Sequence, residues 1–378
     1  MQYWIWLSRC KGMSVSSKLA LYERLGSAQA VYESGMLAQT GLEEAAEILQ
    51  NCKALGIGLL TAGDKRYPRR LLAIADPPLV LYYRGTLPDF DREAAIGVVG
   101  TRKASAYGLM IAESMGRQIS QHGGLVVSGM AAGIDAQAGW GAVRCGAPTV
   151  GVLGGGIDVV YPASNRALYE AVEACGCLIS EYPPGTLPGK WTFPQRNRII
   201  SGLSLGVLAV EAPEKSGTMI TVRDAQKQGR DLFAVPGQVG YASCEGTNSL
   251  LAEGAHAATC GWDILRHYEA QFPEKLRKNA QTAKEQFVSP IPSVKRPVEQ
   301  KIAGAAKGKP SPASKSAPLG DTAEEQAVLS ALSEGERNYD EIITATNLPA
   351  GKVLAVLTML EIKGMVKTLP GRRVIRNL

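Results

Sequence analysis

Short apolar runs that alternate with helical stretches most constrain the fold of this 378-residue chain. They recur between residues 57 and about 265, and the clearest is the run at 96–99, which precedes a helical pattern over 109–119. The other expected strands lie at 125–127, 149–153, 177–180, 207–210 and 231–235, with a further helix at 134–143. Near-continuous apolar strands that alternate with helices are typical of a parallel sheet covered on both faces. The sequence therefore predicts an α/β domain with a doubly wound parallel sheet.

Three further segments flank this domain. Residues 1–56 show helical spacing interrupted by two turn-forming dipeptides, Gly26-Ser27 and Thr40-Gly41, and predict a small helical module. The α/β domain then covers 57–268. Residues 269–321 are rich in Pro, Ser, Ala and Lys, which predicts a flexible basic linker. Residues 322–378 predict three helices, at 323–332, 339–346 and 350–363, and a hairpin formed by 365–367 and 373–375, the pattern of a winged helix.

The net charge of +6 resides in the linker rather than in the expected domains. Residues 271–321 contain ten Lys or Arg and four Asp or Glu, so the rest of the chain is balanced. A nucleic-acid surface on the α/β domain must therefore be a local patch. The seven basic and seven acidic residues of the last domain favour neither DNA binding nor protein contact for the wing.

Few residues are available for metal or histidine chemistry. The seven Cys include no C-x-x-C pair, and there are only three His, so we expect no disulfide framework, no metal site and no histidine-based catalytic group. The apolar run at 3–7 is too short for a signal peptide, and no run is long enough to span a membrane. We expect a cytoplasmic protein that has no contact with a membrane.

Glycine-rich turns follow the expected strands. Gly100-Thr101-Arg102-Lys103 comes after the first strand, and Ser216-Gly217-Thr218 begins the helix after residues 207–210. Two more such turns lie at 128–135 and 154–158. Backbone amides at helix starts bind anions, and the Arg102 guanidinium adds a charged fork. Because these turns follow parallel strands, they lie at the same edge of the sheet, and together they predict phosphate binding there.

The most distinctive stretch lies between Glu181 and Glu211, which contains no acidic residue. Lys190, Arg196 and Arg198 lie there, interleaved with the aromatic residues Trp191 and Phe193. Cations that neutralise phosphates, beside rings on which bases stack, are typical of single-strand nucleic-acid grooves. The alternative interpretation is a core Phe beside a solvated run of charges.

Two nucleotide-binding signatures are absent from the sequence. It contains no G-x-x-x-x-G-K-[ST] loop, and no G-x-G-x-x-G follows the first strand. Asp135 and Asp158 are better interpreted as helix N-terminal acids than as a catalytic pair. We therefore expect no catalytic residues and no cofactor.

Taken in order, the motifs of residues 57–265 resemble those of the DNA-processing protein A (DprA/Smf) family. The matching segments are 64–68, 77–82, 100–102, 128–135, 155–162, 180–185, 193–203, 211–212, 233–237 and 248–255. The helical N-terminus and the winged-helix C-terminus are similar to that family too, with less specific motifs. One departure is Gly139, since the family usually has Ala-His where this chain has Ala138-Gly139.

The resemblance implies an extended Rossmann-like domain that binds single-stranded DNA, forms a homodimer and loads the RecA recombinase onto the strand in natural transformation. Strands covered by single-strand binding protein would be the starting material, which makes that protein a further partner. The predicted DNA-binding residues are Gly100, Thr101, Arg102, Lys103, Ser105, Lys190, Phe193, Arg196, Asn197 and Arg198.

Two alternatives stay open at this point. Residues 213–221 look like the Pro-Gly-Gly-x-Gly-Thr-x-x-Glu signature of phosphoribohydrolases that act on nucleoside monophosphates, but Thr221 stands where that signature has its Glu. Without this carboxylate the general acid/base is missing, so we expect a protein that is not an enzyme. The second alternative is a regulator that binds duplex DNA through the winged helix.

Overall fold

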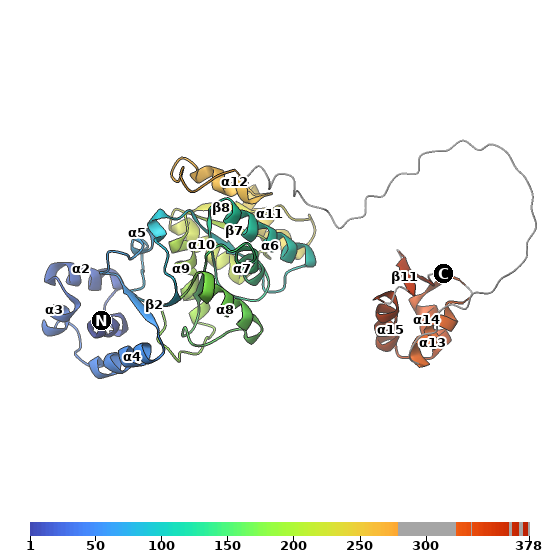
Figure 1. Cartoon of the computed structure of the whole chain (residues 1–378), viewed down its shortest axis with the longest axis horizontal. Helices are drawn as coiled ribbons and strands as arrows, with labels where there is room; N and C mark the ends of the chain where they lie inside the picture. The colour runs from blue at the N-terminus through green and yellow to red at the C-terminus, as the bar shows by residue number, and fades with distance from the viewer. Residues whose placement is uncertain (279–322, 334, 363–364, 370–372, 377–378) are drawn as a thin grey trace, which may run out of the picture. The chain divides into compact units, whose positions relative to one another are not determined.

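The computed structural model describes residues 1–278, 323–333, 335–362, 365–369 and 373–376. The chain divides into two compact units, Met1–Ile291 and Pro292–Leu378 (Figure 1). Most of the predicted linker, residues 279–321, lies outside the described residues.

A nine-stranded sheet forms the centre of the first unit, in the order β1-β2-β6-β5-β4-β3-β7-β8-β9. The strands are β1 Gly58–Thr61, β2 Val80–Gly85, β3 Ala95–Val99, β4 Leu125–Ser128, β5 Thr149–Leu153, β6 Cys177–Ser180, β7 Gly206–Ala209, β8 Asp231–Ala234 and β9 His256–Ala257. The pairs from β6 to β9 are all parallel, which confirms the doubly wound α/β fold. The antiparallel pairs β1–β2 and β2–β6 add an edge that the sequence pattern did not predict.

Helices cover both faces of this sheet. The helices are α5 Arg69–Leu72, α6 Ala106–Gln121, α7 Ile134–Arg144, α8 Arg166–Cys175, α9 Thr192–Leu203, α10 Gly217–Lys227, α11 Glu245–Ala252 and α12 Gly261–Leu265. Because side chains alternate along a strand, Ile96 and Val98 of β3 point to one face and Ala95 and Val99 to the other.

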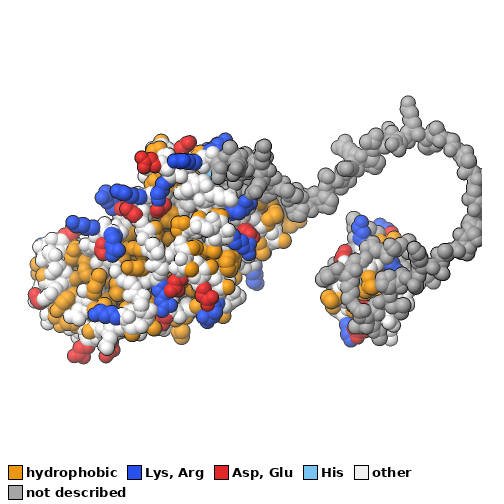
Figure 2. Space-filling view, viewed as in Figure 1, with side chains coloured by type: hydrophobic (Ala, Val, Ile, Leu, Met, Phe, Trp, Pro, Cys, Tyr) orange, Lys and Arg blue, Asp and Glu red, His pale blue; other side chains and the backbone are white. Residues whose placement is uncertain are grey.

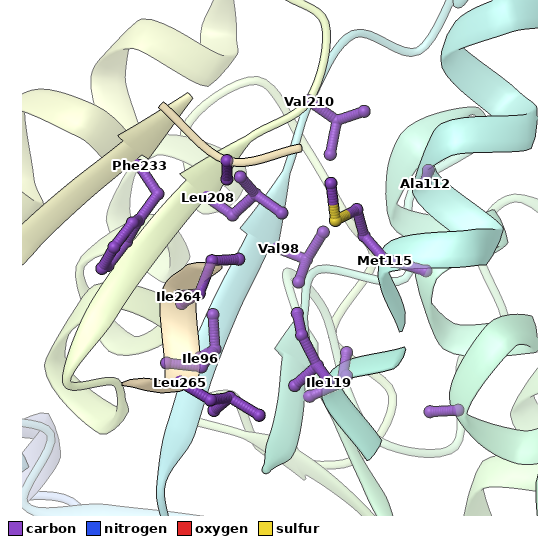
Figure 3. Packing of buried hydrophobic residues seen from close by; sticks show 14 of the residues in the cluster. Ile96, Val98, Ala112, Met115, Ile119, Leu208, Val210, Phe233, Ile264 and Leu265 are labelled. Carbon is purple, nitrogen blue, oxygen red and sulfur yellow. The ribbon is translucent and has the colours of Figure 1, made fainter. Parts of the chain in front are cut away.

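The two faces are packed by different helices. Ile96 and Val98 pack with α6, α7 and α12, together with Leu208 of β7 and Phe233 of β8 (Figure 3). Ala95 and Val99 pack instead with Ile199 of α9 and with residues of α5 and α10. The helix α9, which carries most of the predicted DNA-binding loop, is thus anchored by a buried apolar side.

Four N-terminal helices pack at the β1–β2 end of the sheet: α1 Gln2–Arg9, α2 Val15–Leu25, α3 Ala28–Glu33 and α4 Leu42–Ala54. Gly26 ends α2 in the left-handed conformation at φ 78°, and the Ser27 hydroxyl then caps α3. Their core cluster includes Leu79, next to β2, so the module shares a core with the sheet.

Packing of the first unit continues past residue 268, where we expected the linker to begin. Phe272 and Leu276 are 8% and 2% exposed and belong to the core cluster on the α6 side. The amide of Arg277 donates to the carbonyl of His122 at 3.2 Å. The segment up to residue 278 is therefore part of the packed unit.

The second unit is a winged helix, as predicted. Its helices are α13 Ala323–Ala331, α14 Tyr339–Thr346 and α15 Ala350–Ile362, and its strands are β10 Arg337–Asn338, β11 Val366–Leu369 and β12 Arg373–Arg376. The strands pair in the order β10-β12-β11. The hairpin β11–β12 was expected, whereas the two-residue strand β10 was not.

Two searches of the described residues bear on membrane and metal binding. No single helix is long and apolar enough to cross a membrane; only the bent pair α14–α15 reaches the required length and composition together. Within the same residues, no group of three or more His, Cys, Asp or Glu side chains is arranged to hold a metal ion.

Candidate nucleic-acid interface

A cleft of about 580 Å³ opens at the carboxyl ends of the central strands. The strand order reverses at β3, which has β4 on one side and β7 on the other, and such switch points are where doubly wound sheets bind ligands. The cleft is lined by the turn after β3, the start of α9 and the start of α10. Eight of the ten predicted DNA-binding residues line it: Gly100, Thr101, Arg102, Lys103, Lys190, Phe193, Arg196 and Asn197.

The turn after β3 is held from two sides. The amide of Thr101 donates to the carbonyl of Glu211 at 2.7 Å, and the carbonyl of Thr101 accepts from the amide of Ile134 at 3.3 Å. Gly100 is required here because a Cβ would collide with the Ile134 side chain. These contacts fix the backbone while Arg102 and Lys103 remain exposed at the cleft.

Phe193 forms the aromatic wall of the cleft. The guanidinium carbon of Arg102 lies 4.7 Å from the Phe193 ring centre, within cation–π range. On the other side, the Phe193 and Tyr161 ring centres are 5.5 Å apart. Tyr161 is 47% exposed, so the two rings continue as one accessible aromatic surface. We did not single out Tyr161 from the sequence, although it lies in the matching segment 155–162.

Trp191 lies immediately before α9 and is 85% exposed. Neighbouring Lys190 is also exposed and lines the cleft. Together they place a free ring and a free cation immediately before α9, as the sequence pattern predicts for a strand-binding loop.

Arg196 lines the cleft but is only 3% exposed. Its Nη1 donates to the carbonyls of Gly129 and Val152, at the ends of β4 and β5. Burial lowers its pKa, an effect that the nearby Asp135 carboxylate opposes. Burial likewise raises the pKa of Asp135, and the Arg196 charge and the Gly129 amide oppose that rise. Arg196 therefore ties α9 to the strand ends and holds the cleft wall in place.

Asn197 connects two parts of the cleft. Its Oδ1 accepts from Nε of Arg196 at 3.3 Å, and its Nδ2 donates to the carbonyl of Gly217 at 3.5 Å. The side chain thus links α9 to the start of α10, with part of its surface left accessible in the cleft.

Ser105 lies outside the cleft lining and serves the helix behind it. Its hydroxyl accepts from the amide of Gly108 at 3.0 Å, which caps α6, and donates to Glu211 at 2.8 Å. Glu211 is 1% exposed and also accepts from the Ser105 amide. Through these bonds the amide and the hydroxyl of Ser105 hold the first turn of α6 against the segment that follows β7.

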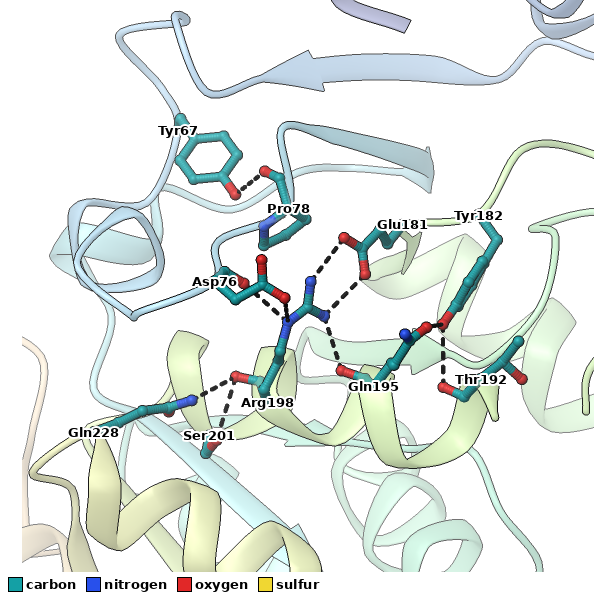
Figure 4. A network of polar contacts seen from close by, with 10 residues as sticks. All are labelled: Tyr67, Asp76, Pro78, Glu181, Tyr182, Thr192, Gln195, Arg198, Ser201 and Gln228. Carbon is teal, nitrogen blue, oxygen red and sulfur yellow. Dashed lines mark hydrogen bonds and ion pairs between the residues drawn. The ribbon is translucent and has the colours of Figure 1, made fainter. Parts of the chain in front are cut away.

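Arg198 also points away from the cleft, into a network on the opposite side of α9 (Figure 4). It donates to both carboxylate oxygens of Glu181, at 2.8 and 2.7 Å, and to the Asp76 carbonyl at 2.9 Å. Burial opposes the charge of Arg198, but the Glu181 bonds prevail and raise its pKa. The structure therefore gives Arg198 protein partners rather than a place in the cleft.

The charge balance of the cleft favours an anionic ligand. Arg102, Lys103 and Lys190 are exposed there, whereas Asp135, almost fully buried, is the sole acidic side chain lining it among the described residues. On the face drawn in Figure 2, by contrast, Lys and Arg side chains lie among Asp and Glu. The cleft is a local basic patch, which matches a phosphate-bearing ligand whose bases can stack.

The fold and the cleft define an extended Rossmann-like protein with a basic, aromatic cleft at its switch point and a separate winged helix. Residues 58–269 match the model of the family described as DNA recombination-mediator protein A, and residues 310–372 match the DprA winged helix domain. The chain belongs to this DprA/Smf family of DNA-processing proteins.

Relatives from other bacteria support this membership. The chain is 39% identical over 228 residues to the DNA processing protein DprA of Bacillus subtilis, covering 60% of this chain and 75% of that protein. It is 35% identical over 327 residues to Protein Smf of Synechocystis, covering 84% of this chain and 80% of that protein.

Two solved structures share the fold. DprA from Streptococcus pneumoniae superimposes with a TM-score of 0.60 at 32% identity, over 70% of this chain and 97% of that chain. DprA from Helicobacter pylori, whose structure is described in terms of its single-stranded DNA binding mode, gives 0.52 at 28% identity, over 57% of this chain and 96% of that chain.

Proposed function

We propose that the cleft at the switch point binds single-stranded DNA without sequence preference. One observation carries the proposal: Arg102 and Phe193 meet at the cleft, with exposed Lys103 and Lys190 beside them. Cations follow the phosphates of a strand, while Phe193, Tyr161 and Trp191 offer faces on which unpaired bases stack. Paired bases are already stacked inside a duplex, so this combination favours single strands.

As a member of the family, the protein would deliver the bound strand to RecA in natural transformation. This extension of the proposal includes a homodimer, a cytoplasmic location and the acceptance of strands covered by single-strand binding protein. Family membership supports it, as does a cleft that takes a strand through its backbone and bases without demanding a sequence.

We also propose that the protein is not an enzyme. Thr221, which stands at the carboxylate position of the phosphoribohydrolase signature, lies on α10 and lines the cleft. Asp135 is held beside Arg196 and the Gly129 amide, which leaves it poorly placed to move a proton to a ligand. Purified protein should release no base from nucleoside monophosphates and should not hydrolyse ATP.

The duplex-DNA alternative receives little support from the wing. The sequence of α15, the third helix, contains only one basic residue, Lys352, and its Nζ forms an ion pair with Glu324 at 2.5 Å. A helix that reads a major groove normally presents several basic or amide side chains.

A titration of the full chain with single-stranded and double-stranded oligonucleotides tests the proposed function. We expect preference for the single strand and a plot of log K against log salt with a slope of about −0.7 for each phosphate contact. Preference for duplex, or affinity that ignores salt, would contradict the proposal. Adding RecA and single-strand binding protein then tests strand delivery, with nucleotide turnover measured in parallel.

Because the linker is basic, non-specific attraction has to be excluded. A chain in which Lys307, Lys309 and Lys315 are replaced by Gln keeps every cleft residue and serves as the control. It should retain the preference for single strands, since that preference comes from the cleft.

A further inference from the structure

The start of α10, residues Ser216 to Thr221, forms a second part of the cleft that the contacts of Arg102 and Phe193 do not use. Three hydroxyl side chains lie there: Ser216 at the N-cap, then Thr218 and Thr221 three residues apart on one side of the helix. All three line the cleft. Thr218 is 7% exposed and Thr221 is 2% exposed.

None of these hydroxyls has a hydrogen-bond partner within the described residues. The Ser216 hydroxyl is buried and unpaired, and neither Thr218 nor Thr221 donates or accepts a side-chain bond there. A buried hydroxyl without a partner costs about 1–3 kcal/mol, so the Ser216 hydroxyl indicates a ligand group that pairs with it. The unpaired hydroxyls of Thr218 and Thr221 line the same cleft and are available to that group.

The backbone at the same place is also left open. Ser216 has the extended conformation of an N-cap, yet its side chain accepts no bond from the helix, whereas the equivalent Ser105 hydroxyl caps α6. The first N–H groups of α10 therefore remain available to another acceptor, and they lie at the positive end of an 11-residue helix.

The surroundings of the α10 N-terminus suit an anion. Asn197 fixes the first residue of α10 by donating to the Gly217 carbonyl, and Lys103 and Lys190 line the same cleft. A Cβ at Gly217 would have nothing within 4 Å, so the backbone there is open to an approaching group.

We propose that the Ser216–Thr218 turn is a second phosphate site, which binds a phosphate of the same DNA strand that the Arg102 turn holds. The inference rests on the proposed function, because it assigns a further contact for that strand. The phosphate is either an internal diester or the 5′-terminal monoester, since both present the oxygens that amides and hydroxyls bind.

A matched pair of variants at Gly217 tests the site. Gly217→Pro removes the first amide but suits a helix start, since proline is accepted at the first helical position and Ser216 already has the extended conformation that precedes proline. Gly217→Ala keeps the amide. Thr218→Val removes a hydroxyl and keeps the shape, and provides a second test if the proline variant does not fold. Ser120→Ala removes a buried unpaired hydroxyl on α6, away from the cleft lining, as a control.

The readout is the dissociation constant of the full chain for an oligothymidylate with and without a 5′-phosphate. We expect Gly217→Pro and Thr218→Val to weaken binding about 2- to 30-fold, the range of a helix-terminus anion contact, while Gly217→Ala and Ser120→Ala bind like the unaltered chain. Equal weakening for both oligonucleotides identifies an internal diester. Weakening confined to the 5′-phosphorylated one identifies the terminal monoester. Unchanged binding of folded Gly217→Pro and Thr218→Val chains would overturn the proposal.

A second measurement separates this inference from the proposed function. Inorganic phosphate should raise the melting temperature relative to chloride at equal ionic strength, because a ligand of the folded state stabilises it. If the unaltered chain fails to bind single strands, the proposed function is wrong, and this measurement alone decides the α10 site. A phosphate effect that persists in Arg102→Ala and disappears in Gly217→Pro supports the site. An equal effect in Gly217→Pro and Gly217→Ala, or none in either, rejects it.

Discussion

The guanidinium carbon of Arg102 lies 4.7 Å from the centre of the Phe193 ring, and this contact joins the turn after β3 to the first turn of α9. The two residues are far apart in the sequence, and the sheet brings them together at its switch point. A cation and a ring in contact form a surface on which a nucleotide can be held by its phosphate and its base at once.

Replacing Arg102 tests the charged half of this surface. Arg102→Ala should weaken single-strand binding and reduce the magnitude of the salt slope by about 0.7, since one phosphate contact is lost. Arg102→Lys should restore only part of the affinity, because a lysine lacks the planar fork. The unfolding transition should be nearly unchanged, since Arg102 is exposed. A folded Arg102→Ala chain with full affinity would identify a structural arginine instead.

Replacing Phe193 tests the aromatic half. Phe193→Ala should cost about 1–3 kcal/mol of binding free energy if a base stacks on the ring. It should also lower the stability, because the ring packs on Tyr161 and against Gly154. Trp191→Ala is the matched variant, since that ring is 85% exposed and its loss should leave stability within about 0.5 kcal/mol. Comparing urea denaturation with affinity separates the two effects. A destabilised Phe193→Ala chain that binds normally per folded molecule would exclude stacking.

Arg196 should behave as a structural residue. Arg196→Met should destabilise the domain by about 3–5 kcal/mol, because it leaves the buried Asp135 without a compensating charge and two carbonyls without a donor. The double replacement Arg196→Met with Asp135→Asn should recover part of this loss, as measured by urea denaturation. A stable Arg196→Met chain with greatly reduced affinity would show instead that Arg196 contacts DNA directly.

Arg198 provides a contrasting case on the opposite side of α9. Arg198→Met should cost about 1–3 kcal/mol of stability through the lost Glu181 bonds, with little change in affinity per folded molecule. Glu181→Gln should reproduce a smaller part of the same loss. If Arg198→Met instead reduced affinity and left the unfolding curve unchanged, Arg198 would have to leave Glu181 when DNA binds.

Stability should fall in mild acid because of His122. Burial lowers its pKa below the ordinary value of 6.5, and its Nδ1 lies 3.0 Å from the Arg277 carbonyl oxygen. Between the two pKa values the unfolded chain binds more protons than the folded chain, so stability rises with pH there. The contribution is complete above about pH 6.5 and is lost as the pH falls through the lower, folded-state pKa.

Urea denaturation at pH 7.5 and at pH 5.5 measures this effect. His122→Asn should reduce the difference between the two free energies of unfolding, whereas the exposed His256→Asn should retain most of it. An identical difference in the unaltered and His122→Asn chains would assign the pH dependence to other groups.

Much of the sheet was predictable, because a strand buried on both faces has to be apolar along its whole length. The runs at 96–99 and 149–153 became β3 and β5 within a residue of the expected bounds. The strands β1 and β2 escaped prediction because they lie at one end of the sheet and each is buried over only part of its length, β1 at its last two residues and β2 at its first three.

The sequence by itself determined the order of strands, helices and glycine turns, because apolar periodicity and backbone freedom are local properties. It also placed the basic and aromatic residues beside one another in the chain. The tertiary structure alone decided which of them reach the cleft. Arg196 and Arg198 are two residues apart on α9, so their side chains leave the helix about 200° apart. One meets the strand ends and Asp135, the other meets Glu181 and Asp76. Neither environment exists until α9 has packed against the sheet. Arg102 is left as the exposed arginine of the cleft because the bonds that hold its turn are made by Thr101 and by the Lys103 amide, and none of them uses the Arg102 side chain.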